Sequence, residues 1–354
     1  MNSSRLDAAP VAEVLAPFPW QMRHWQRLAE ARRQDRLAHA YLLAGPSGVG
    51  KRAFAQRLAA SLLCLEPDAE HLPCGRCAGC LLQRAGSHPD FNLLEPQPGK
   101  TQISIEAIRE LCTALAHTAH QGRFRVAVIR PAEAMTPQSA NSLLKTLEEP
   151  GAGVVLMLVS DRPLAIMPTL LSRCQRLDFS IPAEDQVRAW LGPCADDEVS
   201  MQRLRVLSGG APLQIREFLN GDVTQRLDRL AGEVTGILVG AADPLMVANR
   251  WAKEEPLELV GLWMARLGEE WARLRILAPN RFPVLLDGAS SRIQNVVTRA
   301  DIEDVLAYTT YVRRVRLWLS HGVANRLGLL ESLLVPLATG LRDFRHQEPA
   351  SQTI

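Results

Sequence analysis

Apolar and polar positions follow two different rhythms along the first half of the chain. Short continuous apolar runs, typical of strands buried on both faces of a sheet, alternate with stretches whose apolar residues recur at helical spacing. This alternation predicts a mostly parallel sheet covered by helices, in a nucleotide-binding α/β pattern. The expected strands are 40–45, 90–96, 124–129, 153–160 and 174–180, and the expected helices are 51–64, 104–119 and 137–149.

The strand pattern ends after Pro182, and the rest of the chain has the pattern of helices. Short helices are expected up to about residue 222, and longer ones after it, with breaks near Pro256, Pro279 and Pro283. These changes predict three domains, and the last nine residues, from His346, are expected to form a polar tail. The predicted domains are an α/β domain at 1–182, a small helical domain at 183–222 and a helical domain at 223–354.

The composition narrows the class of protein. Of 354 residues 47% are hydrophobic, and the formal net charge is only +2, so the chain is not a polycation built to coat nucleic acid. Its first twenty residues lack the apolar core of a signal peptide, and no run approaches the roughly 18 apolar residues of a membrane span. We therefore expect a soluble, cytoplasmic protein.

The sequence GPSGVGKR at 45–52 is almost a phosphate-binding loop. Gly45, Gly50 and Lys51 occupy the positions of the pattern G-x-x-x-x-G-K-[ST], in which backbone N–H groups and the lysine bind phosphate oxygens. The last position, which normally supplies a hydroxyl to Mg²⁺, is Arg52, and an arginine has no lone pair to offer a metal. Phosphate binding without metal-dependent chemistry is therefore left open.

A second metal-holding position is altered as well. The strand in VAVIRPAEAM, at 126–135, should end in acidic residues but ends in Arg130 and Pro131. Glu133 is the nearest carboxylate, three residues late, and is expected to be a solvated glutamate at the start of a helix. Because both positions are lost together, we expect no Mg²⁺ site and no ATPase activity of this chain alone, and occupancy by ATP or ADP is doubtful.

Four of the seven cysteines lie close together in the sequence. Cys64, Cys74, Cys77 and Cys80 give the spacing C-x9-C-x2-C-x2-C, which favours a closed tetrahedral site for structural Zn²⁺. An iron–sulfur cluster is the competing interpretation of the same ligands. A closed site of four thiolates leaves no position for a reacting water, so this metal is expected to be structural.

Five sequence motifs follow one another along the chain. They are RLAHAYLLAGPSGVGK (36–51), the four cysteines, GSHPDF (86–91), ANSLLKTLEEP (140–150) and TLLSRCQ (169–175). Taken in this order, they resemble the delta prime family of subunits in the clamp loader of bacterial DNA polymerase III. The resemblance runs from about residue 20 to about 220 and is looser in the helical remainder. It implies an AAA+ core with a zinc-binding insertion, a small helical lid and an all-α C-terminal collar domain.

The resemblance also implies roles for single residues and for partners. Arg173 matches the arginine that reaches across a subunit interface to the γ-phosphate of ATP held by a motor subunit, whereas local sequence alone favours a surface arginine. Ser160 matches a sensor position, and Pro212 or Leu213 stands where a second sensor would have arginine. The implied partners are the gamma/tau motor subunits, the delta subunit, the beta sliding clamp and primer–template DNA, within a holoenzyme that is a DNA-directed DNA polymerase, a nucleotidyltransferase.

Two other functions remain possible from the sequence. One is a self-sufficient ATPase that uses Glu133 with an unconventional metal site. The other is a zinc-containing DNA-binding adaptor that acts alone, for which the segment YVRRVRLWLS at 311–320 offers three arginines beside Trp318. Helical spacing divides those arginines between two faces, so we expect a solvated helix with Leu317 and Trp318 packed.

Overall fold

The computed structural model describes residues 16–195, 197–278, 283–286, 295–296, 298–320 and 325–347. The chain divides into two compact units. The N-terminal unit extends to Trp190 and includes Ala211–Leu213, and the C-terminal unit holds Leu191–Gly210 and the chain from Gln214 onward. The predicted boundaries at 182 and 222 stay a prediction. The part of the expected tail from residue 348 lies outside the described residues.

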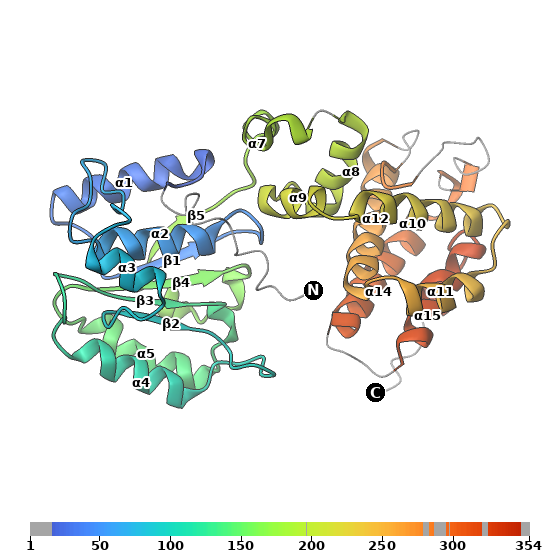
Figure 1. Ribbon diagram of the computed structural model, residues 1–354. Coiled ribbons are helices and arrows are strands. Elements are labelled where there is room, and N and C mark those ends of the chain that lie inside the picture. The colour runs from blue at the N-terminus through green and yellow to red at the C-terminus, as the bar shows by residue number, and fades with distance from the viewer. Residues whose placement is uncertain are drawn as a thin grey trace. The chain divides into compact units, whose positions relative to one another are not determined.

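The N-terminal unit contains a parallel sheet of the five predicted strands (Figure 1). The order across the sheet is β2-β3-β4-β1-β5, and in this register Ala44, Ser160 and Asp178 lie side by side where β1, β4 and β5 end. Loops that follow parallel strands therefore meet at this edge, where α/β proteins bind ligands. The strands are β1 (Ala40–Ala44), β2 (Phe91–Leu94), β3 (Arg125–Ile129), β4 (Val154–Ser160) and β5 (Gln175–Asp178).

Helices cover both faces of the sheet because alternate side chains of the buried strands point to opposite sides. On one face α1 (Met22–Arg33) and α2 (Lys51–Leu63) pack against Tyr41, Leu43 and Met157. On the other face α4 (Ile105–Ala116) and α5 (Pro137–Glu148) pack against Leu42 and Leu158. The predicted helices are confirmed, with ends shifted by a few residues, and α1 was not among them. Shorter helices of this unit are α3 (Ala78–Arg84), α6 (Pro168–Leu171) and α7 (Glu184–Leu191).

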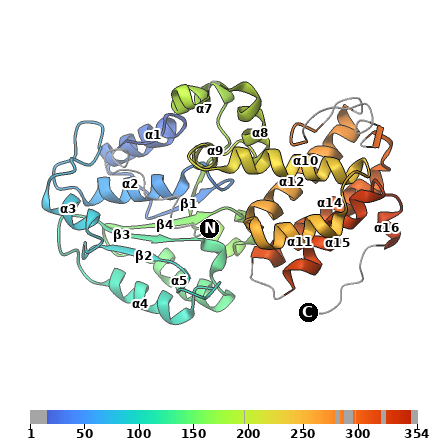
Figure 2. The ribbon, with the colours of Figure 1, turned by 45° about the vertical axis from the view of Figure 1, so that its right-hand side comes forward.

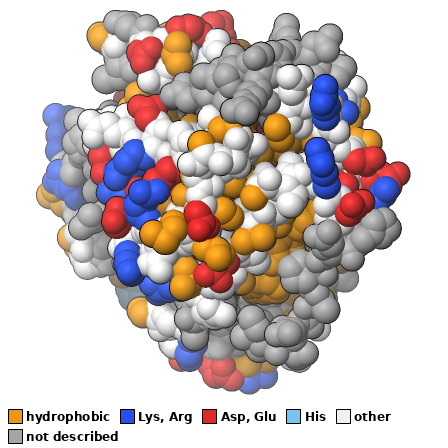
Figure 3. All heavy atoms as spheres, turned by 90° about the vertical axis from the view of Figure 1, so that its right-hand side faces the viewer, with side chains coloured by type: hydrophobic (Ala, Val, Ile, Leu, Met, Phe, Trp, Pro, Cys, Tyr) orange, Lys and Arg blue, Asp and Glu red, His pale blue; other side chains and the backbone are white. Residues whose placement is uncertain are grey.

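The described residues of the C-terminal unit form helices joined by turns and short loops, as predicted (Figure 2). Helix α12 packs along α14, and α15 packs against α10 and α11, around the buried side chains of Trp251, Trp263 and Trp271. Figure 3 looks onto this unit and shows hydrophobic side chains exposed among charged ones. Its helices are α8 (Glu198–Ser208), α9 (Pro212–Leu219), α10 (Val223–Leu238), α11 (Pro244–Glu254), α12 (Leu257–Leu277), α14 (Ile302–Ser320), α15 (Arg326–Ala338) and α16 (Phe344–Gln347).

The segment with three arginines lies in α14. Val312 and Val315 are buried, and Arg313 pairs with Glu269 at 2.9 Å, so much of this helix faces its own bundle. Leu317 was expected to be packed, but 58% of it is exposed. No described helix has both the length and the hydropathy to span a bilayer. The cytoplasmic location stays a prediction.

Candidate functional site

The glycine loop joins β1 to α2, as its sequence predicts. Gly50 has a φ of 87°, in the left-handed region that favours glycine, and a Cβ there would lie 2.7 Å from Nε2 of Gln21. Gly45 has a φ of 150°, and a Cβ there would overlap the carbonyl oxygen of Phe179. Both glycines are thus required by the close approach of neighbouring segments, and the loop geometry survives whether or not it binds phosphate.

Lys51 is buried, and its ammonium is occupied within the chain. The Nζ atom donates to the carbonyl oxygens of Gly45 at 2.8 Å and Pro46 at 2.6 Å, and it pairs with Oδ1 of Asp161 at 2.6 Å. A lysine ammonium has three N–H donors, so these three partners account for all of them. A phosphate would have to displace Asp161 or a loop carbonyl to reach this lysine.

Arginines stand at both positions that would normally hold magnesium. Arg130, directly after β3, is buried and pairs with Glu95 through a contact of 2.6 Å between its NH2 atom and Oε1. Arg52 lies in the first turn of α2, where burial lowers its pKa and the charge of Glu95 acts in the opposite direction. Since an arginine stays protonated in proteins, two positive charges oppose a divalent cation here.

Glu133 does not have the surroundings predicted for it. Its side chain is only 4% exposed, and its Oε1 accepts a hydrogen bond of 3.3 Å from the backbone N–H of Asp161. The expectation of a solvated glutamate is wrong because the short helix Ala132–Ala134 turns this residue back toward the end of β4. Ser160 is also buried, and its Oγ accepts from the N–H of Arg162 at 3.0 Å, as a cap of the turn after β4.

Arg173 lies between α6 and β5, with its side chain 36% exposed. Its NH1 atom donates to the carbonyl oxygen of Thr169 at 2.9 Å and to Oγ of Ser172 at 3.3 Å. Its NH2 atom pairs with Oε1 of Glu148, the last residue of α5, at 2.6 Å. The guanidinium is therefore held by three acceptors while its outer part stays accessible, and this site is separate from the glycine loop.

The four predicted cysteines form one cluster. Their sulfur atoms all lie within 4.8 Å of one another, and Cys64 and Cys80 are buried. The Sγ atoms of Cys64 and Cys77 are 3.8 Å apart, and those of Cys74 and Cys80 are 4.0 Å apart. A tetrahedral ion with Zn–S bonds of about 2.3 Å keeps its sulfurs about 3.8 Å apart. The cluster could therefore hold a metal ion.

Backbone donors in the cluster favour thiolates. The N–H groups of Cys74, Cys77 and Cys80 donate to the sulfurs of Cys64, Cys74 and Cys77, at 3.3 to 3.4 Å. Burial acts to raise the pKa of Cys77, but hydrogen bonds from the backbone of Cys80 and Leu65 and from neighbouring thiols outweigh it and lower the pKa to about 6. Burial raises the pKa of Cys64 and Cys80. Thiolates are the form that binds metal, and the N–H groups that donate to the sulfurs stabilise such ligands.

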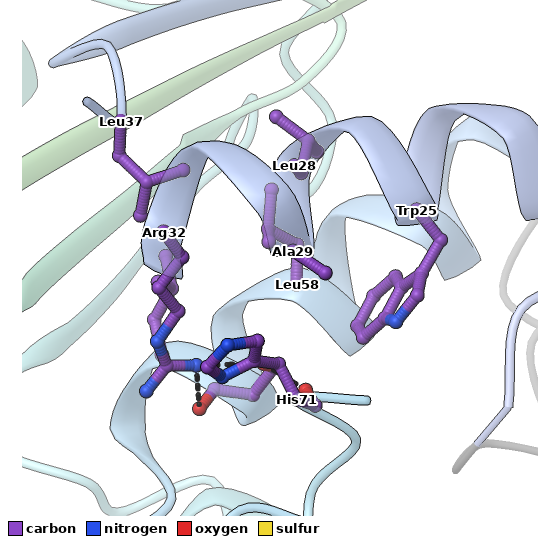
Figure 4. A pocket seen from close by; sticks show the side chains of 9 residues that line it. Trp25, Leu28, Ala29, Arg32, Leu37, Leu58 and His71 are labelled. Atoms are coloured by element: carbon purple, nitrogen blue, oxygen red, sulfur yellow. Dashed lines mark hydrogen bonds between the residues drawn. The ribbon is translucent and has the colours of Figure 1, made fainter. Parts of the chain in front are cut away.

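The cysteine segment is anchored on α1 and α2, beside a small apolar cavity (Figure 4). Arg32 of α1 donates to the backbone oxygen and to Oγ of Ser61, each at 3.0 Å, and that hydroxyl donates in turn to the carbonyl oxygen of His71. Nε1 of Trp25 donates to the carbonyl oxygen of Glu70 at 3.1 Å. The position of α1 on the sheet is thereby linked to the segment that leads into Cys74.

Residues around the glycine loop that the sequence did not single out also hold it. Gln21 is fully buried, and its Nε2 donates to the carbonyl oxygens of Val49 at 3.1 Å and Gly50 at 3.0 Å. Nε1 of Trp20 also donates to the Val49 oxygen at 3.0 Å. The sequence PFPWQ at 17–21, with two aromatic residues, indicates that this segment packs against other residues. Nothing in its pattern predicts that it contacts the glycine loop.

We expect Gln21→Ala to lower the free energy of unfolding by about 1–3 kcal/mol, because it removes one donor each from the oxygens of Val49 and Gly50 and takes away the side-chain acceptor of the buried N–H of Phe18. Gln26→Ala, on the exposed side of α1, is the matched control and should have almost no effect. Denaturant unfolding of the two variants measures the difference. Equal stability of both variants would show that Gln21 does not support the loop.

Comparison with known proteins agrees with this architecture. The family model described as DNA polymerase III, delta subunit, matches residues 20–183. The DNA polymerase III subunit delta prime of Pseudomonas aeruginosa is 36% identical over 327 residues, which cover 91% of this chain and 97% of that relative. The chain belongs to the delta prime family of DNA polymerase III subunits. The resemblance predicted from the motifs is thus confirmed.

Other proteins of the DNA polymerase III group are also similar to this chain. The DNA polymerase III subunit tau of Salmonella typhimurium is 32% identical over 196 residues, 54% of this chain and 30% of that relative. A solved gamma-subunit-related protein of Thermotoga maritima aligns with a TM-score of 0.42 at 16% identity, over 91% of this chain and 100% of that one. The predicted parallel α/β core with a cysteine insertion and a helical C-terminal region is confirmed for the described residues.

Proposed function

We propose that this delta prime family member is a catalytically silent clamp-loader subunit that acts on a neighbour's ATP. It assembles with motor subunits of the gamma/tau type and with a delta subunit, and it helps to load the beta sliding clamp on primed DNA. Family membership and the similarity to a tau subunit support these partners. The work of this chain is to hold the assembly in register and to present Arg173.

The glycine loop supports the silent role. All three donors of the Lys51 ammonium are engaged by Gly45, Pro46 and Asp161, and the metal-holding positions carry Arg52 and Arg130. Phosphoryl transfer in AAA+ relatives needs a lysine on the phosphates and a divalent ion bridging them. This chain offers neither without rearrangement, so hydrolysis belongs to the neighbouring subunits.

The observation that carries the proposal is the environment of Arg173. Its guanidinium is partly exposed, fixed by Thr169, Ser172 and Glu148, and situated at the end of a helix turn from which it can reach outward. When water attacks the γ-phosphorus of bound ATP, the bond to the bridging oxygen of ADP breaks and negative charge spreads over the phosphoryl oxygens. A planar guanidinium held beside those oxygens stabilises that charge.

We further propose that the cysteine cluster binds Zn²⁺ and that the ion is structural. Cys64, Cys74, Cys77 and Cys80 would be its ligands, and the sulfur spacing and the backbone N–H donors fit a tetrahedral ion. Four protein ligands complete that coordination, so the ion would hold the segment 64–84 in shape and take no part in hydrolysis.

The decisive experiment is ATP hydrolysis by the assembled clamp loader, stimulated by DNA and clamp, with wild-type chain and with Arg173→Ala. A large fall in turnover with assembly intact is expected. An unchanged rate would leave this chain a structural member and would remove the proposed role of Arg173.

The isolated chain is expected to release no phosphate from ATP above background, with or without Mg²⁺. Arg52→Thr alone should not restore hydrolysis, because Arg130 still occupies the second metal-holding position and Asp161 still neutralises Lys51. Steady-state phosphate release measures this. Turnover that Lys51→Ala abolishes would contradict the proposal and would favour the self-sufficient ATPase.

A further inference from the structure

An ion pair joins the end of α5 to the segment that carries Arg173. We propose that Glu148 is the positioning residue of Arg173: its carboxylate fixes the guanidinium in the orientation that meets a neighbour's γ-phosphate. This inference rests on the proposed function of Arg173 and assigns a further residue to the same site.

The contacts define how the guanidinium is held. NH1 binds Thr169 and Ser172, which belong to its own turn, and NH2 binds Glu148, which comes from another helix, at 2.6 Å. The bonds to Thr169 and Ser172 fix the guanidinium only relative to its own turn, so a movement of that turn would also move the guanidinium. The carboxylate of Glu148 adds a fixed point on α5, whose Leu143 and Leu147 are buried in the core of the sheet domain. The pair with Glu148 therefore fixes the position of the guanidinium relative to the core of the sheet domain.

Donors remain on the guanidinium for a ligand. An arginine has five N–H donors, and within the described residues three of them are used by Thr169, Ser172 and Glu148. The remaining two can meet phosphate oxygens, and the side chain is 36% exposed. Glu148 therefore orients the group without covering it.

The position of Glu148 in its helix argues against a role in helix stability. It is the last residue of α5, and a carboxylate at a helix C-terminus lies beside the negative end of the helix dipole. The N-terminus of α5 is already capped by Thr136, whose hydroxyl accepts from the N–H of Ser139. A glutamate at this end destabilises the helix slightly, and its favourable interaction is the ion pair with Arg173.

Because the Glu148–Arg173 pair is exposed, its effect on the rate of hydrolysis can be measured without a large effect on stability. Glu148 is 51% and Arg173 36% exposed, and such solvent-exposed pairs add little to stability. Removing the carboxylate of Glu148 should therefore leave the fold and the assembly unchanged. The guanidinium of Arg173 would then adopt further orientations, in which it does not contact the γ-phosphate. Positioning losses of this kind reduce the rate of the chemical step much more than substrate affinity.

The test uses the assembled clamp loader with its motor and delta subunits. Glu148→Gln is expected to lower the rate of DNA- and clamp-stimulated ATP hydrolysis at the motor site that Arg173 serves, measured in a single turnover, by about 10-fold, with the affinity for ATP nearly unchanged. Glu148→Asp should recover part of the rate, because it restores the charge on a shorter side chain. Glu149→Gln, which removes the adjacent exposed carboxylate, is the matched control and should leave the rate unchanged.

A double-variant comparison separates this inference from the proposed function. If Glu148 acts only through Arg173, then Glu148→Gln has no further effect in the Arg173→Ala background. A normal or faster rate for Glu148→Gln, with Arg173→Ala impaired, would overturn the role of Glu148 and leave that of Arg173. An additive loss in the double variant would also overturn it. An unimpaired Arg173→Ala complex would overturn both.

Discussion

Arg173→Ala is expected to lower the rate of ATP hydrolysis at the motor site that Arg173 serves by about 10³-fold or more. An arginine finger contributes about 10³ to 10⁵ to such rates, because a fixed positive charge meets the negative charge that develops on the transferred phosphoryl group. If the motor sites hydrolyse ATP independently, the steady-state rate of the whole complex falls only by the contribution of that one site. If hydrolysis at all sites is coupled, the rate falls almost completely.

The measurement combines steady-state turnover with a single-turnover experiment, which reports the served site separately. Arg176→Ala is the matched control, because Arg176 lies nearby on β5 and forms an exposed ion pair with Asp178. Arg173→Lys should recover little of the rate, since lysine keeps the charge but lacks the planar fork of donors. Size-exclusion chromatography establishes that each variant assembles. A rate equal to that of the control variant would refute the role of Arg173.

Strands β1 and β4 could be predicted because each is a continuous apolar run with a clear stop. All residues of β1 and β4 are buried, so no polar position interrupts the pattern. Helix α1 was missed for the opposite reason. Its twelve residues MRHWQRLAEARR bury only Trp25, Leu28 and Ala29, which is too sparse an apolar stripe to stand out against the polar positions.

The parts of the site that lie close together in the sequence could also be predicted. Gly45, Gly50 and Lys51 form one loop, and the four cysteines form one short segment. The partners that define their state come from distant segments: Asp161 reaches Lys51 from the end of β4, and Glu95 reaches Arg130 from beyond β2. Local spacing carries no information on such pairs, because the sheet register brings them together.

The error on Glu133 has the same origin. A glutamate at the start of a short helix is typical of a solvated, dipole-stabilising position, and nothing in its neighbours indicates burial. Only the parallel pairing of β3 with β4 brings the turn after β3 against the turn after β4, where Glu133 meets the N–H of Asp161. The motif shows that Arg52 and Arg130 stand in place of the usual metal ligands, but it carries no sign that Glu133 is buried against the N–H of Asp161.

Loss of one cysteine of the cluster is expected to remove the metal and to unfold the segment it holds. Purified wild-type chain should contain a stoichiometric amount of Zn²⁺, and Cys77→Ser should contain almost none, because three thiolates no longer complete the tetrahedral site. Structural zinc binding contributes about 10–16 kcal/mol in small zinc domains, which is more than the packing of so short a segment can replace.

Loss of the metal should first affect the segment that contains the cysteines and the helix that contacts it. The segment 64–84 is joined to the core by Ser61, Arg32 and Trp25, so we expect faster hydrogen exchange there and at α1, while β1, β3 and β4 stay protected. Cys112→Ser is the matched control, because Cys112 lies on α4 outside the cluster. Unchanged zinc in the Cys77→Ser chain would contradict the ligand assignment. Iron with visible absorption in the wild-type chain would instead establish the iron–sulfur alternative, since zinc has no such absorption and both fit four thiolates.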